Sequence, residues 1–231
     1  MYRIIQETAD FLVVDKAPGV AMHKDQAESG LVMQIKADLA LSALLPVHRL
    51  DKVTSGVLLF AKHPQAASLL SQQFARREVE KFYLAISDQK PRRKQGLIVG
   101  DMERSRRGGW KLLRSRENPA ITQFFSTSLS SGLRLFLLKP HTGKTHQLRV
   151  ALKSEGAPIL GDWQYHSASQ GIDRTYLHAY SLQFHWDGQP VTVCSPPSNG
   201  QYFDQSCRTL IEQHYAQPSA LDWPTIPRGH S

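Results

Sequence analysis

His48–Lys62 reads HRLDKVTSGVLLFAK, and this stretch carries the strongest structural signal in the chain. Its second half contains the apolar run Val57–Phe60, which follows a turn containing glycine and has the length typical of a buried β-strand. Its first half contains a single carboxylate, that of Asp51, between two cations, Arg49 and Lys52. The stretch therefore predicts an acidic side chain that a rigid strand of the core holds still.

Asp51 has two interpretations from local chemistry. A carboxylate kept ionised by positive neighbours is suited to act as a nucleophile or to orient a reacting group. An aspartate beside basic residues more often caps a turn or forms a surface ion pair, here with Arg49. The local sequence leaves both roles open.

The whole of His48–Lys62 resembles the signature of RluA-type pseudouridine synthases, in which HRLD is followed by TSG and an apolar strand that ends in Ala-Lys. In that family the aspartate of HRLD is the catalytic residue, so the resemblance implies this role for Asp51. It also implies that Arg49 fills the space left by an extruded uridine or holds a phosphate. We expect His48 to be a further RNA-contacting residue.

Tyr83 lies in the string Lys81–Ala85, KFYLA, which resembles the family's Lys-x-Tyr-x-Ala motif. The resemblance implies that Tyr83 packs against the target base and assists proton removal late in the reaction. Without it, Tyr83 would be read as an ordinary aromatic residue of a half-buried strand.

The string His141–Arg149, HTGKTHQLR, resembles the family's Thr-Gly-Arg-Thr-His-Gln-Ile-Arg block, with Lys144 and Leu148 as its departures. The resemblance implies that Arg149 pairs with Asp51, because a guanidinium holds a carboxylate ionised and fixed. By itself Arg149 would equally suit a surface cation or an anion contact. We expect Lys144 to contact RNA.

Gly143–Thr145 also invites a phosphate-loop interpretation, because GK[ST] ends the nucleotide-binding pattern GxxxxGK[ST]. That pattern requires glycine at position 138, where this chain has Leu138. The sequence therefore argues against a nucleotide hydrolase.

Two further segments, Gly161–Tyr165 and Leu177–Ala179, resemble the family's Gly-Asp-x-x-Tyr segment and its Leu-His-Ala strand. The resemblance implies that both are structural walls of the catalytic cleft. Neither is specific on its own.

Composition limits the class of protein. The chain has 231 residues, 41% of them hydrophobic, which is enough for one substantial core, and its formal net charge of +8 should attract polyanions such as RNA, DNA or an anionic membrane. No apolar run approaches the ~20 residues that span a bilayer, so we expect a soluble, cytoplasmic protein with no membrane partner. Cys194 and Cys207 lie outside any CxxC pattern and no HExxH motif occurs, which predicts no metal site.

Hydrophobic periodicity and turn residues predict the order of the elements. Strands are expected at 4–5, 11–14, 57–60, 80–86, 121–125, 133–138, 176–186 and 191–193, and helices at 31–45, 64–77, 145–155 and 201–215. With the resemblance, these elements imply an α+β pseudouridine synthase fold, a mixed and largely antiparallel central sheet flanked by helices and loops. We expect residues 1–200 to form the catalytic domain, and residues 201–231 a last helix and an extended or disordered tail with prolines.

Residues 90–116 form a basic segment in which apolar periodicity fades and glycines surround a lone Trp110. One interpretation is a solvated, partly mobile loop, and the other is an RNA-contacting arm that orders on phosphates. Both stay open. The arginines expected to contact RNA in the second case are Arg104, Arg106 and Arg107.

The resemblance implies an isomerase that converts specific uridines of rRNA or tRNA to pseudouridine. Such an enzyme breaks the N1–C1′ glycosidic bond and joins C5 to C1′ without a cofactor, and family resemblance favours a monomer. The alternative is a non-catalytic RNA-binding or chaperone module, which the charge supports but which gives no reason for HRLD, Tyr83 and Arg149 to occur together. A DNA-binding regulator ranks lower, because no helix-turn-helix or zinc pattern is recognisable.

Overall fold

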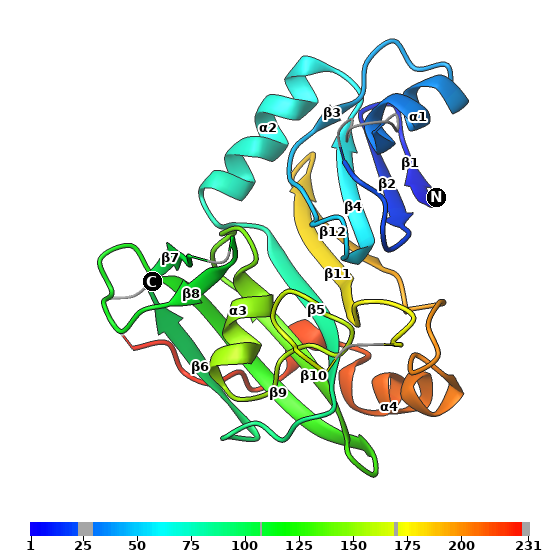
Figure 1. Ribbon diagram of the computed structural model, residues 1–231. Helices are drawn as coiled ribbons and strands as arrows, with labels where there is room; N and C mark the ends of the chain where they lie inside the picture. The colour runs from blue at the N-terminus through cyan, green and yellow to red at the C-terminus, as the bar shows by residue number, and fades with distance from the viewer. Residues whose placement is uncertain (23–29, 107, 169–170, 228–231) are drawn as a thin grey trace. The chain divides into compact units, whose positions relative to one another are not determined.

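The structure, a computed structural model, describes residues 1–22, 30–106, 108–168 and 171–227 (Figure 1). The chain divides into two compact units. The first unit contains residues 1–80 and 178–196, and the second contains residues 81–177 and 197–231. Within the described ranges, no helix is long and apolar enough to cross a membrane.

The first unit is a sheet built around β4, the strand that the apolar run predicts. Its strands are paired in the order β1, β2, β4, β11, with β12 beside β11 and β3 beside β4, and the β4–β11 pair is parallel. Their bounds are β1 Tyr2–Glu7, β2 Phe11–Lys16, β3 Leu45–Pro46, β4 Ser55–Ala61, β11 Leu177–Trp186 and β12 Gln189–Cys194, and the helices are α1 Leu31–Asp38 and α2 Pro64–Ala75.

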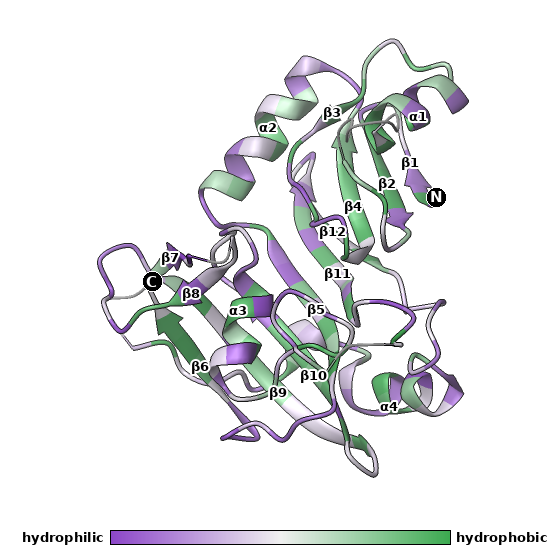
Figure 2. Cartoon of the chain, in the orientation of Figure 1, coloured by the Kyte–Doolittle hydropathy of each residue, from purple (hydrophilic) through white to green (hydrophobic). Residues whose placement is uncertain are grey.

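Every residue of β4 is buried, which explains why its sequence shows no alternation of apolar and polar residues. Leu59 packs in one cluster with Phe11 of β2 and Leu70 of α2. Figure 2 shows β2 and β4 as hydrophobic strands, and α2 with alternating hydrophobic and hydrophilic bands. Helix α2 begins where the sequence predicts, since Pro64 is compatible with the first helical turn and the His63 side chain accepts the N–H of Ala66.

The second unit is an antiparallel sheet with the strand order β5, β10, β9, β6, and a separate hairpin of β7 and β8. Helix α3 packs against β8, β9 and β10, and α4 packs against β9. The bounds are β5 Glu80–Ser87, β6 Gln95–Gly100, β7 Met102–Arg104, β8 Trp110–Leu112, β9 Ala120–Ser130, β10 Leu133–Pro140, α3 Gln147–Ser154, α4 Gln205–Tyr215 and a 3₁₀ turn at Pro218–Ala220.

The predicted α+β class is confirmed, because both units combine helices with largely antiparallel strands and the parallel β4–β11 pair makes the sheet mixed. The predicted helix at 31–45 is too long. It ends at Asp38, since Ala40 adopts a left-handed conformation with φ 49° that breaks the helical path. The helix predicted from Thr145 begins at Gln147 for the same reason, because His146 has φ 59°.

Residues 90–116 contain strands that the sequence did not predict, so the interpretation as a solvated loop does not fit much of this segment. Leu97, Ile98 and Val99 lie in β6, which pairs with β9, and the basic residues that follow form the β7–β8 hairpin. The C-terminal tail is more ordered than expected, because Trp223 packs on Phe125 with 4.8 Å between ring centroids.

Gly56 is required where β4 begins. Its φ is +107°, and a Cβ atom built on it would lie 2.1 Å from the carbonyl oxygen of Ala179, its partner in the parallel pairing of β4 with β11. No side chain fits in that space, so the glycine of the TSG turn lets β11 approach the strand that follows Asp51.

We predict that Gly56→Ala lowers the free energy of unfolding by about 3 kcal/mol or more, because backbone strain and a backbone clash act together. Gly188→Ala is the matched control, since Gly188 has φ +72° but open space around its missing Cβ; it should cost about 1 kcal/mol. Urea unfolding of both variants measures the difference. Equal losses would contradict the close β4–β11 approach.

Candidate functional site

Asp51 lies in the loop between β3 and β4, as the sequence predicts. Its carbonyl oxygen accepts the N–H of Thr54 at 3.0 Å, which closes a tight turn just before the strand. Leu50 and Thr54 are buried on either side, whereas Asp51 is half-buried and Arg49 is exposed. The loop is therefore anchored at both ends, and Asp51 lies between two exposed cations, Arg49 and Lys52.

Lys16 fixes the part of this loop that follows Asp51, and no sequence motif indicated this role. Its side chain is fully buried, and Nζ donates to the carbonyl oxygens of Ala17, Val20 and Lys52 at 3.0, 2.9 and 3.2 Å. The N–H of Gly19 donates to the same Lys52 carbonyl at 2.8 Å. A buried ammonium requires such partners, so it fixes the backbone beside Asp51.

His48 attaches the start of the loop to its surroundings. Its Nε2 accepts the backbone N–H of Leu59 in β4 at 2.9 Å, and its ring stacks on Phe74 of α2 with 4.7 Å between centroids. These contacts position the HRLD segment. The predicted contact of His48 with RNA stays a prediction.

His178, the histidine of the Leu-His-Ala strand, connects β4 to the chain after β12. It is buried, and its Nε2 donates to the carbonyl oxygen of Ser195 at 2.7 Å. Because a carbonyl only accepts, Nδ1 is left to accept the Ser55 hydroxyl, also at 2.7 Å. The segment predicted as a wall thus fixes the first residue of β4.

Gln147 organises the HTGKTHQLR block in the second unit. Its buried Oε1 accepts the Thr142 hydroxyl at 2.7 Å and the Lys144 N–H at 3.1 Å, while Nε2 donates to the carbonyl of Ile121 and the hydroxyl of Thr122. Each polar atom of the amide therefore has partners, which locks the loop before α3 onto β9.

Arg149 forms a buried bidentate ion pair with Asp162. Nε and Nη2 lie 2.7 and 2.8 Å from the two carboxylate oxygens, and the side chains are 4% and 0% exposed. Nη2 also donates to Gln164 at 3.1 Å, and the guanidinium lies 4.9 Å from the ring centre of Tyr165. These hydrogen bonds do not use Nη1.

Asp162 and Gln164 bind Arg149, whereas from the sequence they were expected only to form a wall of the cleft. The signal was present, because the GDWQY string resembles a family motif that contains a carboxylate. The predicted partner of Arg149 was Asp51, which belongs to the other unit. That pairing stays a prediction.

Tyr165 connects the β7–β8 hairpin to the start of α3. Its hydroxyl accepts the backbone N–H of Trp110 at 2.9 Å and lies 2.7 Å from Nδ1 of His146. Gln164, which also contacts Arg149, donates to the carbonyl of Gly108 in the hairpin turn at 3.3 Å. The hairpin is therefore attached to the residues that hold Arg149.

Two of the arginines predicted to contact RNA lie in this hairpin and are exposed. The guanidinium of Arg104 lies 5.6 Å from the ring centre of Trp110, and Arg106 is in the turn. Arg107 lies outside the described residues. The structure thus brings Arg104 and Arg106 together on one small element.

Lys144 reaches the loop before β9, where its Nζ donates to the carbonyl oxygen of Asn118. The same loop binds Asp101, and the hydrogen bond from Ser115 is the largest cause that lowers the pKa of this carboxyl. The N–H groups of Glu117 and Asn118 and the charge of Lys144 add to the lowering. Lys144 therefore lies over an ordered turn.

Tyr83 is half-buried in β5, opposite Leu138 of β10. Trp163 is 76% exposed, whereas its neighbours Asp162 and Gln164 are buried and half-buried. No motif in the sequence pointed to Trp163.

In the described parts of the chain, no group of three or more His, Cys, Asp or Glu side chains could hold a metal ion.

Known proteins are similar to this chain in sequence and in fold. Residues 10–154 match the family model described as RNA pseudouridylate synthase. A Haemophilus influenzae protein named "Uncharacterized RNA pseudouridine synthase" is 48% identical over 210 residues, 91% of this chain and 93% of the relative. The tRNA pseudouridine synthase C of Pasteurella multocida is 32% identical, over 83% of this chain and 90% of its own.

The solved structure of Human RNA Pseudouridylate Synthase Domain Containing 1 matches with a TM-score of 0.77 and 27% identity, over 98% of this chain and 97% of the human one. Fold and sequence together define an RNA-modifying isomerase. The chain belongs to the RNA pseudouridylate synthase family, which confirms the resemblance first seen in HRLD and TSG.

We predict that Asp162→Ala lowers the free energy of unfolding by about 3–5 kcal/mol, because it leaves the buried Arg149 guanidinium without its carboxylate. The double variant Arg149→Met/Asp162→Leu removes both charges and should recover much of this loss. Urea unfolding of the three proteins gives the comparison. A loss below about 1 kcal/mol in Asp162→Ala would show that the pair does not hold the site.

Proposed function

We propose that this pseudouridine synthase isomerises specific uridines in rRNA or tRNA, with Asp51 as the nucleophile. The proposal rests mainly on the Asp51 loop. Hydrogen bonds of Lys16 and His48 and the adjoining β4 strand hold this loop in place, while Asp51 itself is half-buried. A nucleophile must be held in place and yet be accessible. The name of the Pasteurella multocida relative supports tRNA as one substrate class.

The chemistry transfers no group to another molecule. The N1–C1′ bond breaks, the uracil turns, and C5 bonds to C1′, while C5 loses a proton and N1 gains one. Asp51 attacks the sugar or the base and leaves again at the end. Tyr83 packs against the uracil and assists removal of the C5 proton, as in the family's Lys-x-Tyr-x-Ala motif.

Arg149 orients the Asp51 carboxylate and balances its charge. Asp162 and Gln164 bind Nε and Nη2 of Arg149, which restrains the planar guanidinium. In this proposal Nη1, which these hydrogen bonds do not use, donates to Asp51. A pre-organised guanidinium orients a carboxylate with little loss of entropy. Asp162 is in this scheme a positioning residue.

The target uridine is extruded from its RNA stack toward Asp51. The exposed Arg49, two residues from Asp51, fills the vacated space. His48, Lys144, the hairpin arginines Arg104 and Arg106, and also Arg107 contact the RNA, mainly its phosphates.

Trp163 stacks on an RNA base next to the target. An indole that is 76% exposed loses water contact on stacking, and its backbone is fixed by neighbours that bind Arg149.

We predict that Asp51→Asn binds RNA like the unmodified protein but forms no pseudouridine, because an amide is nearly the same shape and is not a nucleophile. The measurement is pseudouridine formation in RNA isolated from cells that lack the gene, with RNA binding followed in parallel. A non-catalytic RNA-binding module would give no product with either protein.

Asp38→Asn serves as the matched control, since Asp38 is an exposed aspartate of the same unit that accepts the Tyr2 hydroxyl. It should keep full activity. Product formation by Asp51→Asn at the unmodified rate would remove Asp51 from the mechanism.

We predict that Trp163→Ala weakens RNA binding by about 1–3 kcal/mol, the usual contribution of one stacked base. Trp163→Phe should also remove most of the change in tryptophan fluorescence that RNA causes. Trp186→Phe is the control, because Trp186 packs on Phe11 and donates to Asp10. An RNA-induced change that survives in Trp163→Phe and disappears in Trp186→Phe would contradict stacking on Trp163.

A further inference from the structure

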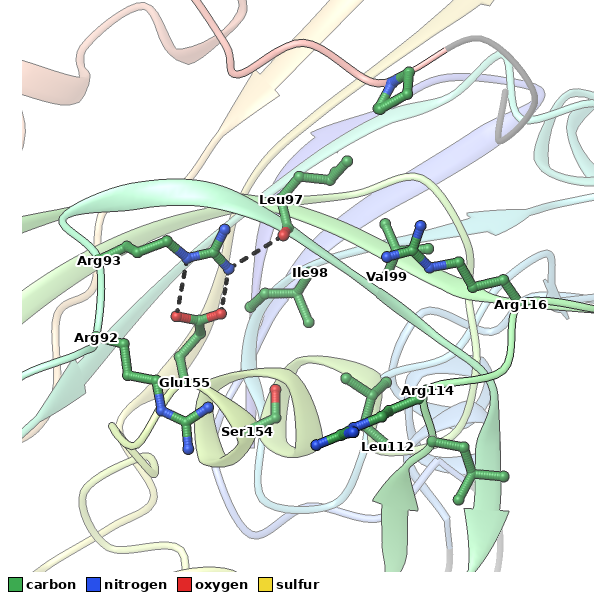
Figure 3. A pocket seen from close by; sticks show the side chains of 12 residues that line it. Arg92, Arg93, Leu97, Ile98, Val99, Leu112, Arg114, Arg116, Ser154 and Glu155 are labelled. Atoms are coloured by element: carbon green, nitrogen blue, oxygen red, sulfur yellow. Dashed lines mark hydrogen bonds and ion pairs between the residues drawn. The ribbon is translucent and has the colours of Figure 1, made fainter.

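A groove of about 640 Å³ lies on the second unit (Figure 3). It is bounded by β6, by β8 with the segment after it, and by the C-terminal end of α3. Its floor is aliphatic, with Leu97, Ile98, Val99 and Leu112, and its rim carries four arginines: Arg92, Arg93, Arg114 and Arg116. Neither the motifs nor the proposed mechanism uses it.

The groove has a large excess of positive charge. Glu155 is the only carboxylate among the lining residues that the structure describes, and this buried side chain accepts two hydrogen bonds from Arg93. Arg93 also donates to the carbonyl of Leu97. Glu155 therefore neutralises one guanidinium, and three further arginines remain on the rim.

Arg92 and Arg114 have no side-chain hydrogen bond or ion pair with any residue that the structure describes. Both are exposed, and Figure 3 shows them reaching from two sides toward the end of α3 that carries Ser154. A helix C-terminus attracts cations, but its partial charge is only about −0.5. That charge is too small to balance the guanidinium groups of Arg92 and Arg114, so the groove is suited to an anionic ligand.

We propose that this groove binds a strand of RNA through its phosphates. Arginine is well suited to phosphate oxygens, and the aliphatic floor offers contact to ribose and base faces. RNA as the ligand rests on the proposed function, which brings this polyanion to the protein. The groove lies at the C-terminal end of α3, the helix that carries Arg149, so the strand it holds flanks the nucleotides near that residue.

The residues that line the groove also indicate whether it would recognise the sequence of the RNA. Among the described lining residues, Ser154 is the only uncharged polar side chain, and none carries an amide or aromatic group that could read the edges of bases. The groove therefore adds affinity without sequence preference. Selection of the uridine is left to the residues around Asp51.

The test is the salt dependence of RNA binding by Arg92→Ala/Arg114→Ala. A fluorescein-labelled single-stranded RNA of mixed sequence is titrated by anisotropy from about 50 to 200 mM salt, where each lost phosphate contact removes about 0.7 from the slope of log affinity against log salt. We expect the slope to fall by about 1.4, so that the affinity lost over this range shrinks about sevenfold.

Lys90→Ala/Lys94→Ala is the matched control. Both lysines are exposed in the same segment and do not line the groove, and the variant removes the same two positive charges. Its slope should stay near that of the unmodified protein, as should the slope of Arg92→Lys/Arg114→Lys. An unchanged slope in Arg92→Ala/Arg114→Ala, or an equal fall in the lysine variant, would overturn the proposal.

A second measurement needs no variant. Phenylglyoxal modifies accessible arginines, and mass spectrometry of the protein with and without the RNA should show protection of Arg92 and Arg114. Modification at the same rate in both samples would also overturn the proposal.

Failure of the groove and failure of the catalytic proposal are distinguishable. Binding requires no turnover, so the slopes can be measured in an Asp51→Asn background. In assays of pseudouridine formation, the Arg92→Ala/Arg114→Ala variant should raise KM and leave kcat unchanged. Activity that persists in Asp51→Asn would remove the catalytic role of Asp51 and leave the groove standing.

Discussion

The buried ion pair of Arg149 and Asp162 is the constraint on which the second unit's site depends. Taking a guanidinium and a carboxylate out of water costs several kcal/mol for each ion, and only complete, well-oriented hydrogen bonding offsets that cost. The bidentate contact, the bond to Gln164 and the adjacent Tyr165 ring supply it. The geometry of α3, of the GDWQY segment and of the β7–β8 hairpin follows from this single requirement.

The first unit also buries a charged group, the ammonium group of Lys16. Its buried ammonium group is satisfied by three backbone carbonyls, one of which belongs to the residue after Asp51. Gly56 then allows β11 to approach β4 without a side chain between them. Burial of charge and absence of a Cβ atom thus position the same short loop from its two sides.

Local signals in the sequence predicted the elements that a short window determines. The apolar run Val57–Phe60 gave β4, and Pro64 with the periodicity behind it gave α2. The HRLD, KFYLA and HTGKTHQLR strings gave the family, which the comparisons confirm. The roles of Asp51, Tyr83 and Arg149 came from that resemblance and remain predictions.

What the sequence could not predict are the contacts made across long separations. Lys16 and Gln147 look like ordinary polar residues until the fold gives them partners at Lys52 and Ile121. Strand β6 was hidden because its short apolar run lies among arginines and glycines, and it is stabilised by pairing with β9. The end of α1 was hidden because Ala40, with φ 49°, carries no sequence signal for a left-handed conformation.

The same arginines that hid β6 form the rim of the groove beside it. A segment read as a flexible basic arm is therefore a folded surface, and its charge is displayed in a fixed arrangement. Fixed cations lose less entropy on binding a phosphate backbone than a mobile arm would. In our proposal the basic segment supplies affinity for RNA, and the catalytic motifs select the uridine and carry out the chemistry.

The most direct measurement is a map of pseudouridines in total RNA from three strains: one with the gene, one without it, and one in which the gene carries Asp51→Asn. If Asp51 performs the isomerisation, at least one pseudouridine disappears when the gene is removed, and the Asp51→Asn copy does not restore it. An unchanged map in the strain without the gene, or full restoration by the Asp51→Asn copy, would contradict this role.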